Sequence, residues 1–117
     1  MSDGFQISLR DAIAALPAAP AEQYAIVHRH GTFTAGVYAP RGVDDQTPHT
    51  RDEAYVVVKG TGQFVCGAAR RPFGPGELLF VPAGMTHRFE SFSEDLTVWV
   101  IFYGPQGGEE QHVEEGD

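Results

Sequence analysis

Two histidines and one glutamate stand where strand geometry would bring their side chains together. His49 and Glu53 precede the apolar run 54–58, and His87 follows the run 78–81 and a short turn. Side chains along a strand alternate between its faces, so residues 49 and 53, an even number apart, point to one face. Two imidazoles and one carboxylate from neighbouring strands make half of an octahedral metal shell. The pattern therefore predicts a metal site with positions left open for water, dioxygen or a substrate.

Two further residues are candidates for orienting a substrate at such a site. Tyr55 and Arg51 have the same parity as Glu53, so both are expected on the same face. The planar guanidinium of Arg51 could hold a substrate carboxylate through a bidentate pair of hydrogen bonds. The alternative is a solvent-facing arginine at the mouth of the fold, and the sequence leaves both interpretations open.

The segments around the site are short β-rich runs separated by glycine and proline. These runs predict strands at residues 24–30, 32–39, 53–59, 62–67, 77–81, 86–91 and 96–103. Gly60 predicts a tight hairpin, and Pro75 followed by Gly76 predicts a type II turn, because glycine tolerates positive φ. Many short strands with frequent turns favour an all-β sandwich or barrel over a parallel α/β sheet.

A short helix is expected before the first strand. Ser8 is a suitable N-cap with an acidic residue, Asp11, three positions later. Ile13 and Leu16 repeat at helical spacing until Pro17 ends the pattern. We expect this helix to pack on the outside of the main body.

Length and composition limit the class of protein. At 117 residues the chain is one domain, which we divide into a helix and connector (1–22), a β-barrel (23–104) and an acidic, flexible tail (105–117). The net charge of −8 argues against nucleic acid and anionic membrane as partners. No apolar run is long enough to span a bilayer, and no signal peptide is visible. A single cysteine, Cys66, cannot form an internal disulfide, which favours a cytoplasmic location.

The residues after the predicted turn carry a recognisable spacing. Gly76, Pro82, Gly84, His87 and Ser91 follow the second sequence motif of the cupin superfamily of small β-barrels, which often has asparagine where this chain has Ser91. The physical sense of the motif is clear, because Pro82 ends a strand and Gly84 permits a sharp reversal. His87 then enters the next strand.

The first cupin motif is matched in part. Glu53 and Gly60 have its spacing, and His49 stands at its second histidine, whereas its first histidine falls on Thr47. The resemblance covers roughly residues 25–103 and implies a jelly-roll (double-stranded β-helix) barrel with a central pocket. It further implies a divalent metal ion (Fe, Mn, Ni or Zn) held by His49, Glu53 and His87. Gln46, Thr47 or a water could be accessory ligands.

The resemblance leaves the activity open between classes of protein. A metal-dependent enzyme on a small organic molecule is the first hypothesis. Oxygenase-like chemistry is favoured because two histidines and a carboxylate suit Fe(II), while isomerase, lyase and hydrolase chemistry are possible on the same scaffold. The alternative is a non-catalytic module that binds or senses a small ligand, with a structural metal or none. Small cupins commonly pair, so a homodimer is expected, with the N-terminal segment or first strands at the contact.

The other candidate residues have simpler interpretations. His28 and His30 alternate with other residues along a predicted strand and are expected at the surface or at a subunit edge. Cys66 is expected to be a small buried apolar group rather than a nucleophile. Asp44 and Asp45 are interpreted as solvated turn charges.

Overall fold

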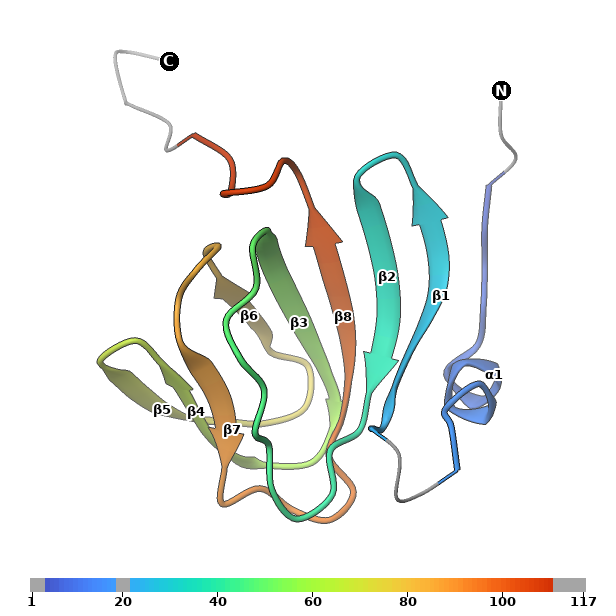
Figure 1. Ribbon diagram of the computed structural model, residues 1–117. Helices are drawn as coiled ribbons and strands as arrows, with labels where there is room; N and C mark the ends of the chain where they lie inside the picture. The colour runs from blue at the N-terminus through green and yellow to red at the C-terminus, as the bar shows by residue number, and fades with distance from the viewer. Residues whose placement is uncertain (1–3, 19–21, 111–117) are drawn as a thin grey trace.

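The computed structural model describes residues 4–18 and 22–110, which form a jelly-roll barrel of two antiparallel sheets with a short N-terminal helix (Figure 1). The larger sheet has the strand order β1-β2-β8-β3-β6, and the smaller sheet has the order β5-β4-β7. The strands are β1 (Tyr24–His30), β2 (Phe33–Tyr38), β3 (Asp52–Lys59), β4 (Gly62–Cys66), β5 (Ala69–Phe73), β6 (Leu78–Val81), β7 (His87–Glu90) and β8 (Thr97–Tyr103). The predicted all-β class and jelly-roll architecture are confirmed.

One strand was not predicted. Strand β5 contains Arg70, Arg71 and Pro72, which are charged or lack a backbone donor and so do not resemble a strand in sequence. It is an edge strand that pairs with β4 alone, with Pro72 opposite Gln63. Proline is tolerated there because one side of an edge strand donates to no neighbour.

Glycines make the predicted turns. Gly60 joins β3 to β4 with φ of 103°, and Gly76 precedes β6 with φ of 88°, both in the region that favours glycine. A Cβ on Gly60 would stand 2.6 Å from the Cα of Leu96, so this turn also packs tightly against the chain before β8. Both turn predictions are confirmed.

Helix α1 (Leu9–Ala14) packs on the outside of the barrel, against β2 (Figure 1). The Ser8 hydroxyl accepts a hydrogen bond from the Asp11 amide at 3.0 Å, which confirms the predicted cap. The helix ends at Ala14, whereas the spacing of Ile13 and Leu16 predicted that it would reach Leu16. Within the described residues, no helix is long and apolar enough to cross a membrane.

The core lies between the two sheets and is built from inward residues of both. Tyr55 and Val57 of β3, Phe64 of β4, Phe89 of β7 and Val98 of β8 are buried in it. Residues 105–110, the first part of the predicted tail, are tied to the barrel, since the Glu109 amide donates to the buried Asp52 carboxylate at 2.9 Å. The rest of the predicted tail, 111–117, lies outside the described residues.

Candidate metal centre

Two loops that are distant in sequence are joined at one end of the barrel. The Gly84 amide donates to the carbonyl of His49 at 2.7 Å, and the Ala83 amide donates to the Asp52 carboxylate at 2.9 Å. Gly84 has φ of 81°, as a sharp reversal after β6 requires. These bonds hold the segment before β3 against the turn before β7. They bring His49 next to the start of the strand that carries His87.

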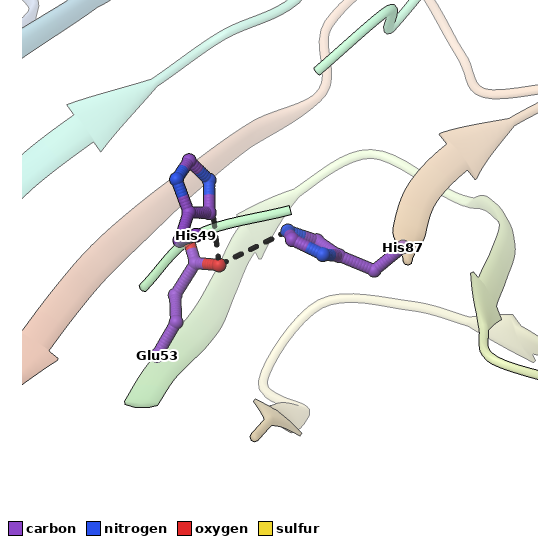
Figure 2. A group of neighbouring side chains, drawn as sticks. All are labelled: His49, Glu53 and His87. Carbon is purple, nitrogen blue, oxygen red and sulfur yellow. Dashed lines mark ion pairs between the residues drawn. The ribbon is translucent and has the colours of Figure 1, made fainter. Parts of the chain in front are cut away.

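The three predicted ligands converge on one point. Glu53 projects inward from β3, His87 is the first residue of β7, and His49 lies in the loop before β3 (Figure 2). The Glu53 Oε1 atom is 3.0 Å from Nε2 of His87 and 3.8 Å from Nε2 of His49. One ligand atom from each residue lies within 4.8 Å of the other two. Such a cluster could hold one divalent ion.

Two buried atoms of this cluster lack hydrogen-bond partners among the described residues. His87 and Glu53 are each 1% exposed, and Nδ1 of His87 lies 2.9 Å from the Met85 carbonyl oxygen. That carbonyl can only accept, so Nδ1 carries a hydrogen and Nε2 is left with a lone pair when the ring is neutral. Within residues 4–18 and 22–110, neither Nε2 of His87 nor Oε1 of Glu53 makes a hydrogen bond, although the two atoms are close enough for an ion pair.

This arrangement fits a metal ion. Two buried acceptor atoms that face one another repel unless a cation lies between them. Burial lowers the pKa of His87, but the Glu53 carboxylate and the Met85 carbonyl raise it more, so the pKa lies above its usual value. The site therefore attracts positive charge, which a proton or a divalent ion can supply. An imidazole whose other nitrogen is held by a carbonyl is the usual form of a metal-ligating histidine.

Comparison with known proteins places this barrel in a family. A family model described as Cupin domain matches residues 36–103, which include all three residues of the cluster. This chain is a cupin. The family model thus bears out the resemblance carried by the two sequence motifs.

The cupin has relatives of similar length. It is 38% identical over 80 residues to the uncharacterized protein SCO3923 of Streptomyces coelicolor, covering 67% of this chain and 76% of that protein. KdgF of a Halomonas species has a similar structure, with a TM-score of 0.64, 22% identity, and coverage of 77% of this chain and 84% of that one. A Ralstonia eutropha protein, provisionally named a mannose-6-phosphate isomerase, gives a TM-score of 0.56 at 25% identity over 80% and 95% of the chains.

A hydrogen-bonded network beside the cluster was not predicted. Asp44 is 4% exposed, so its interpretation as a solvated turn charge was wrong. Its two oxygens accept from the Tyr38 hydroxyl at 2.7 Å, the Phe89 amide at 2.8 Å, and the side-chain amide of Gln46 at 2.7 Å. Hydrogen bonds from these donors offset the cost of burying the carboxylate in the low dielectric of the core. No local sequence signal distinguishes this residue from its neighbour Asp45, which is exposed.

Asp44 fixes the direction of the Gln46 side chain. Because the NH2 group of Gln46 donates to Asp44, its carbonyl oxygen must point the other way, toward the cluster. That oxygen accepts from the Tyr55 hydroxyl at 3.0 Å and lies 3.4 Å from Nε2 of His49. Burial and the Glu53 carboxylate raise the pKa of Tyr55 well above its ordinary value, so the phenol stays protonated and donates.

The cluster opens into a pocket of about 170 Å³. Glu53, His49, Gln46 and Tyr55 line this pocket together with aromatic and aliphatic side chains and Glu22. A volume of this size holds about five or six water molecules at roughly 30 Å³ each. The pocket can thus take a small molecule next to the candidate ligands.

Arg51 and Thr47 do not line this pocket, although Arg51 lines a neighbouring hollow beside His49 and Phe102. The Arg51 guanidinium donates to the Thr32 carbonyl and to the Thr34 hydroxyl, at the hairpin between β1 and β2. It does not line the pocket, and its predicted role in binding a substrate carboxylate gains no support from its position. Thr47 is exposed and also does not line the pocket, whereas the neighbouring Gln46 does.

The other candidate residues lie outside the cluster. His28 is in the edge strand β1 and stacks on Phe5, with ring centroids 4.2 Å apart. Cys66 is half-buried in β4, and its Sγ atom lies 3.3 Å from the sulfur of Met85. Burial raises the pKa of the Cys66 thiol, so a reactive thiolate is disfavoured.

Proposed function

We propose that this cupin is a metal-dependent enzyme that acts on a small organic molecule in the barrel pocket, with oxygenase-like chemistry favoured. The observation that carries the proposal is the pair of buried, unpartnered atoms, Oε1 of Glu53 and Nε2 of His87, beside an open pocket. A purely structural site would instead be closed by four protein ligands. Three ligands beside an open pocket suit a catalytic ion.

His49, Glu53 and His87 would hold a divalent ion, with Fe, Mn, Ni and Zn as candidates. When bound, such an ion polarises a substrate oxygen or activates water or dioxygen. Gln46 is the candidate for an additional, neutral oxygen ligand, because Asp44 turns its carbonyl oxygen toward the cluster. A six-coordinate ion held by these four residues would still keep two positions open, unlike a tetrahedral structural site. Tyr55 would orient both Gln46 and a substrate, since its hydroxyl lies at the pocket wall.

The pocket favours an uncharged substrate. In the described part of the chain, neither lysine nor arginine lines it, and Glu22 and Glu53 add negative charge. Arg51, the predicted carboxylate anchor, donates its hydrogen bonds to Thr32 and Thr34 at the β1–β2 hairpin. An uncharged small molecule avoids the repulsion that an anionic substrate would meet.

Metal affinity tests the ligand set. We expect the wild-type protein to bind Mn²⁺ or Zn²⁺ in titration calorimetry at one ion per chain and His87→Ala to lose this binding while its circular dichroism stays β-like. Gln46→Ala should weaken binding by about 10- to 100-fold. Thr47→Ala is the matched control, because Thr47 occupies the motif position of a ligand but faces solvent, and it should bind as wild type does.

Turnover tests the enzyme. The Fe(II)-loaded protein is incubated in air with a panel of small uncharged metabolites while oxygen consumption and product formation are followed. Conversion by wild type that is lost in His87→Ala supports the proposal. A second candidate function is non-catalytic binding, which is favoured by the solvent-facing Thr47 at the position of a family histidine. Tight ligand binding with no product from any panel member would support that candidate and refute the enzyme.

A further inference from the structure

A second hollow adjoins the metal pocket on the side of β1 and β2. It has a volume of about 310 Å³, and Tyr24, His49 and Phe102 line both this hollow and the pocket. The rings of His49 and Phe102 meet edge to face, with centroids 4.9 Å apart, and form a wall that the two spaces share. We call the second space the arginine hollow, because Arg29 and Arg51 line it.

The inner face of the larger sheet extends from the metal cluster to this hollow. Residues paired between antiparallel strands lie on the same face of a sheet. One row of paired residues crosses β1, β2, β8 and β3 and consists of Arg29, Thr34, Phe102 and Glu53. Glu53 is buried in the barrel, whereas Arg29 is exposed on the edge strand β1 (Figure 1). The row therefore runs from the buried cluster outward to the arginine hollow.

Arg51 reaches the same hollow from the loop before β3. Its guanidinium donates to the Thr32 carbonyl and, at 3.1 Å, to the Thr34 hydroxyl, and its central carbon lies 5.9 Å from the centre of the Phe102 ring. A guanidinium has five N–H groups, so these two bonds leave others available. The Thr34 hydroxyl accepts from Arg51 and can donate its own hydrogen. Arg29, Arg51 and Thr34 thus bring hydrogen-bond donors to one hollow.

Neither arginine of the hollow has an acidic partner. Among the described residues, the ion pairs of arginine are those of Arg10, Arg70 and Arg88, and they do not include Arg29 or Arg51. The chain has 16 acidic residues and only 8 basic ones, so an unpaired arginine is not forced by composition. Two unpaired arginines at one hollow indicate a site where an anion from outside the chain supplies the missing charge.

The charges around Tyr24 show how close the two arginines are. Burial raises the pKa of Tyr24, and Glu53 and Glu22 raise it further, whereas the positive charges of Arg29 and Arg51 act in the opposite direction. Both guanidinium groups therefore lie near one hydroxyl, and two like charges there repel each other. Glu22 and Glu53 line the metal pocket but not the arginine hollow. The two adjoining spaces thus carry opposite charge.

We propose that the arginine hollow binds a small oxyanion, a phosphate or a carboxylate, as a second ligand beside the metal pocket. The planar guanidinium matches such groups, because two of its N–H groups meet two oxygens. The sequence predicted that Arg51 would hold a substrate carboxylate on the face of the cluster. The proposed anion instead lies on the other side of His49, with Arg29 as its second arm. The metal pocket, beside Glu53, keeps its preference for an uncharged molecule.

Titration with inorganic phosphate tests this proposal. Metal is removed with a chelator that is then dialysed away, because metal would bind phosphate and the carboxylates of the chelator would compete for the hollow. Phosphate replaces chloride at constant ionic strength while the side-chain Nε–H signals of Arg29 and Arg51 are followed by NMR. We expect one saturable site with a dissociation constant of about 1 mM, which two or three charge-assisted hydrogen bonds provide. Acetate is titrated in parallel, and the tighter of the two anions identifies the class of ligand.

Arg29→Gln should raise the dissociation constant of the anion by about 10-fold or more, because it removes both the charge and the planar fork. Arg29 is exposed, so the circular dichroism of the variant should remain that of wild type. Arg51→Gln tests the other arm and should also weaken binding. Arg71→Gln is the matched control, since it makes the same change at an exposed position of β5 in the smaller sheet, and it should bind as wild type does.

Two results would overturn the proposal. One is a response that does not saturate for either anion, which would show only a general effect of ions on the surface. The other is saturable binding that survives in both Arg29→Gln and Arg51→Gln or is weakened equally in Arg71→Gln. Because metal is absent throughout, these results concern the arginine hollow alone, and the proposed function is judged separately by metal affinity and turnover.

Discussion

Glu53→Gln should stabilise the metal-free protein and abolish its stabilisation by metal. In the metal-free chain, Oε1 of Glu53 and Nε2 of His87 are both buried acceptors without a hydrogen-bond partner. The glutamine amide has nearly the shape of the carboxylate but offers an NH2 group. Placed 3.0 Å from Nε2, that group can donate to the imidazole lone pair. The substitution therefore replaces a repulsive contact by a hydrogen bond.

The magnitude follows from the burial of both atoms. A buried polar atom without a partner costs roughly 1–3 kcal/mol, and the substitution removes at least one such atom. We expect the free energy of unfolding to rise by about 1–3 kcal/mol. For a chain of this length, the melting temperature should rise by about 4 °C for each kcal/mol. With metal at 100 times its dissociation constant, wild type should gain about 2.7 kcal/mol, whereas the variant should gain little.

Thermal unfolding by circular dichroism, with and without Zn²⁺, measures both effects. The assay is run at about pH 9, well above the ordinary histidine pKa of about 6.5, because the pKa of His87 is raised and a high pH favours the neutral imidazole. The variant should melt higher than wild type in chelator and lower than wild type in metal. Glu94→Gln, which makes the same chemical change at an exposed position, should alter neither curve. If Glu53→Gln melts lower than wild type in chelator, the two atoms form a stabilising pair and the reasoning about an ion site is refuted.

Two further predictions concern the same cluster. Because the folded-state pKa of His87 is raised, protonation of His87 should stabilise the metal-free protein fully below about pH 6.5, and this stabilisation should be lost as the pH rises through the raised pKa. Urea unfolding from pH 6 to 9 in chelator measures this change in the free energy of unfolding. A flat profile in wild type, or an equal slope in Glu53→Gln, would contradict the prediction. Asp44→Asn should lower the free energy of unfolding by roughly 1–3 kcal/mol and weaken metal binding about 10-fold, because a new donor would face existing donors and release Gln46. Asp45→Asn, at the exposed neighbour, should leave both quantities unchanged in the same denaturation and calorimetry measurements.

Most strands of the barrel and the three clustered residues could be predicted from the sequence. Apolar runs and glycine turns identify strands wherever packing demands apolar side chains, as in β3 and β8. The spacing from Gly76 to His87 identifies the reversal that delivers the imidazole. Strand β5 escaped prediction because its pairing with β4 is a tertiary fact, and its arginines and proline carry no strand signal of their own.

The open part of the outer sheet surface was also beyond the reach of local patterns. The apolar residues of β3, such as Ala54 and Val56, could have belonged to a strand buried on both faces. Only the register with β6 and β8, together with the position of α1, separates a covered face from an open one. Such long-range pairing cannot be read from the alternation within one strand.

Residues 44–51 do not show the alternation of side chains between two faces that holds within a strand. Strand β3 begins at Asp52, so the residues before it are not held to alternate faces, and each side chain follows its own bonds instead. Arg51 shares the parity of His49 yet turns to the β1–β2 hairpin, where two acceptors hold its guanidinium. Gln46 has the opposite parity to His49 yet faces the pocket, because the buried carboxylate of Asp44 binds its NH2 group. The polar side chain beside the cluster is thus that of Gln46, one residue before the motif position at Thr47. A substitution that restores histidine at Thr47 would add a side chain on the solvent side, unless the bonds of Asp44 were broken first.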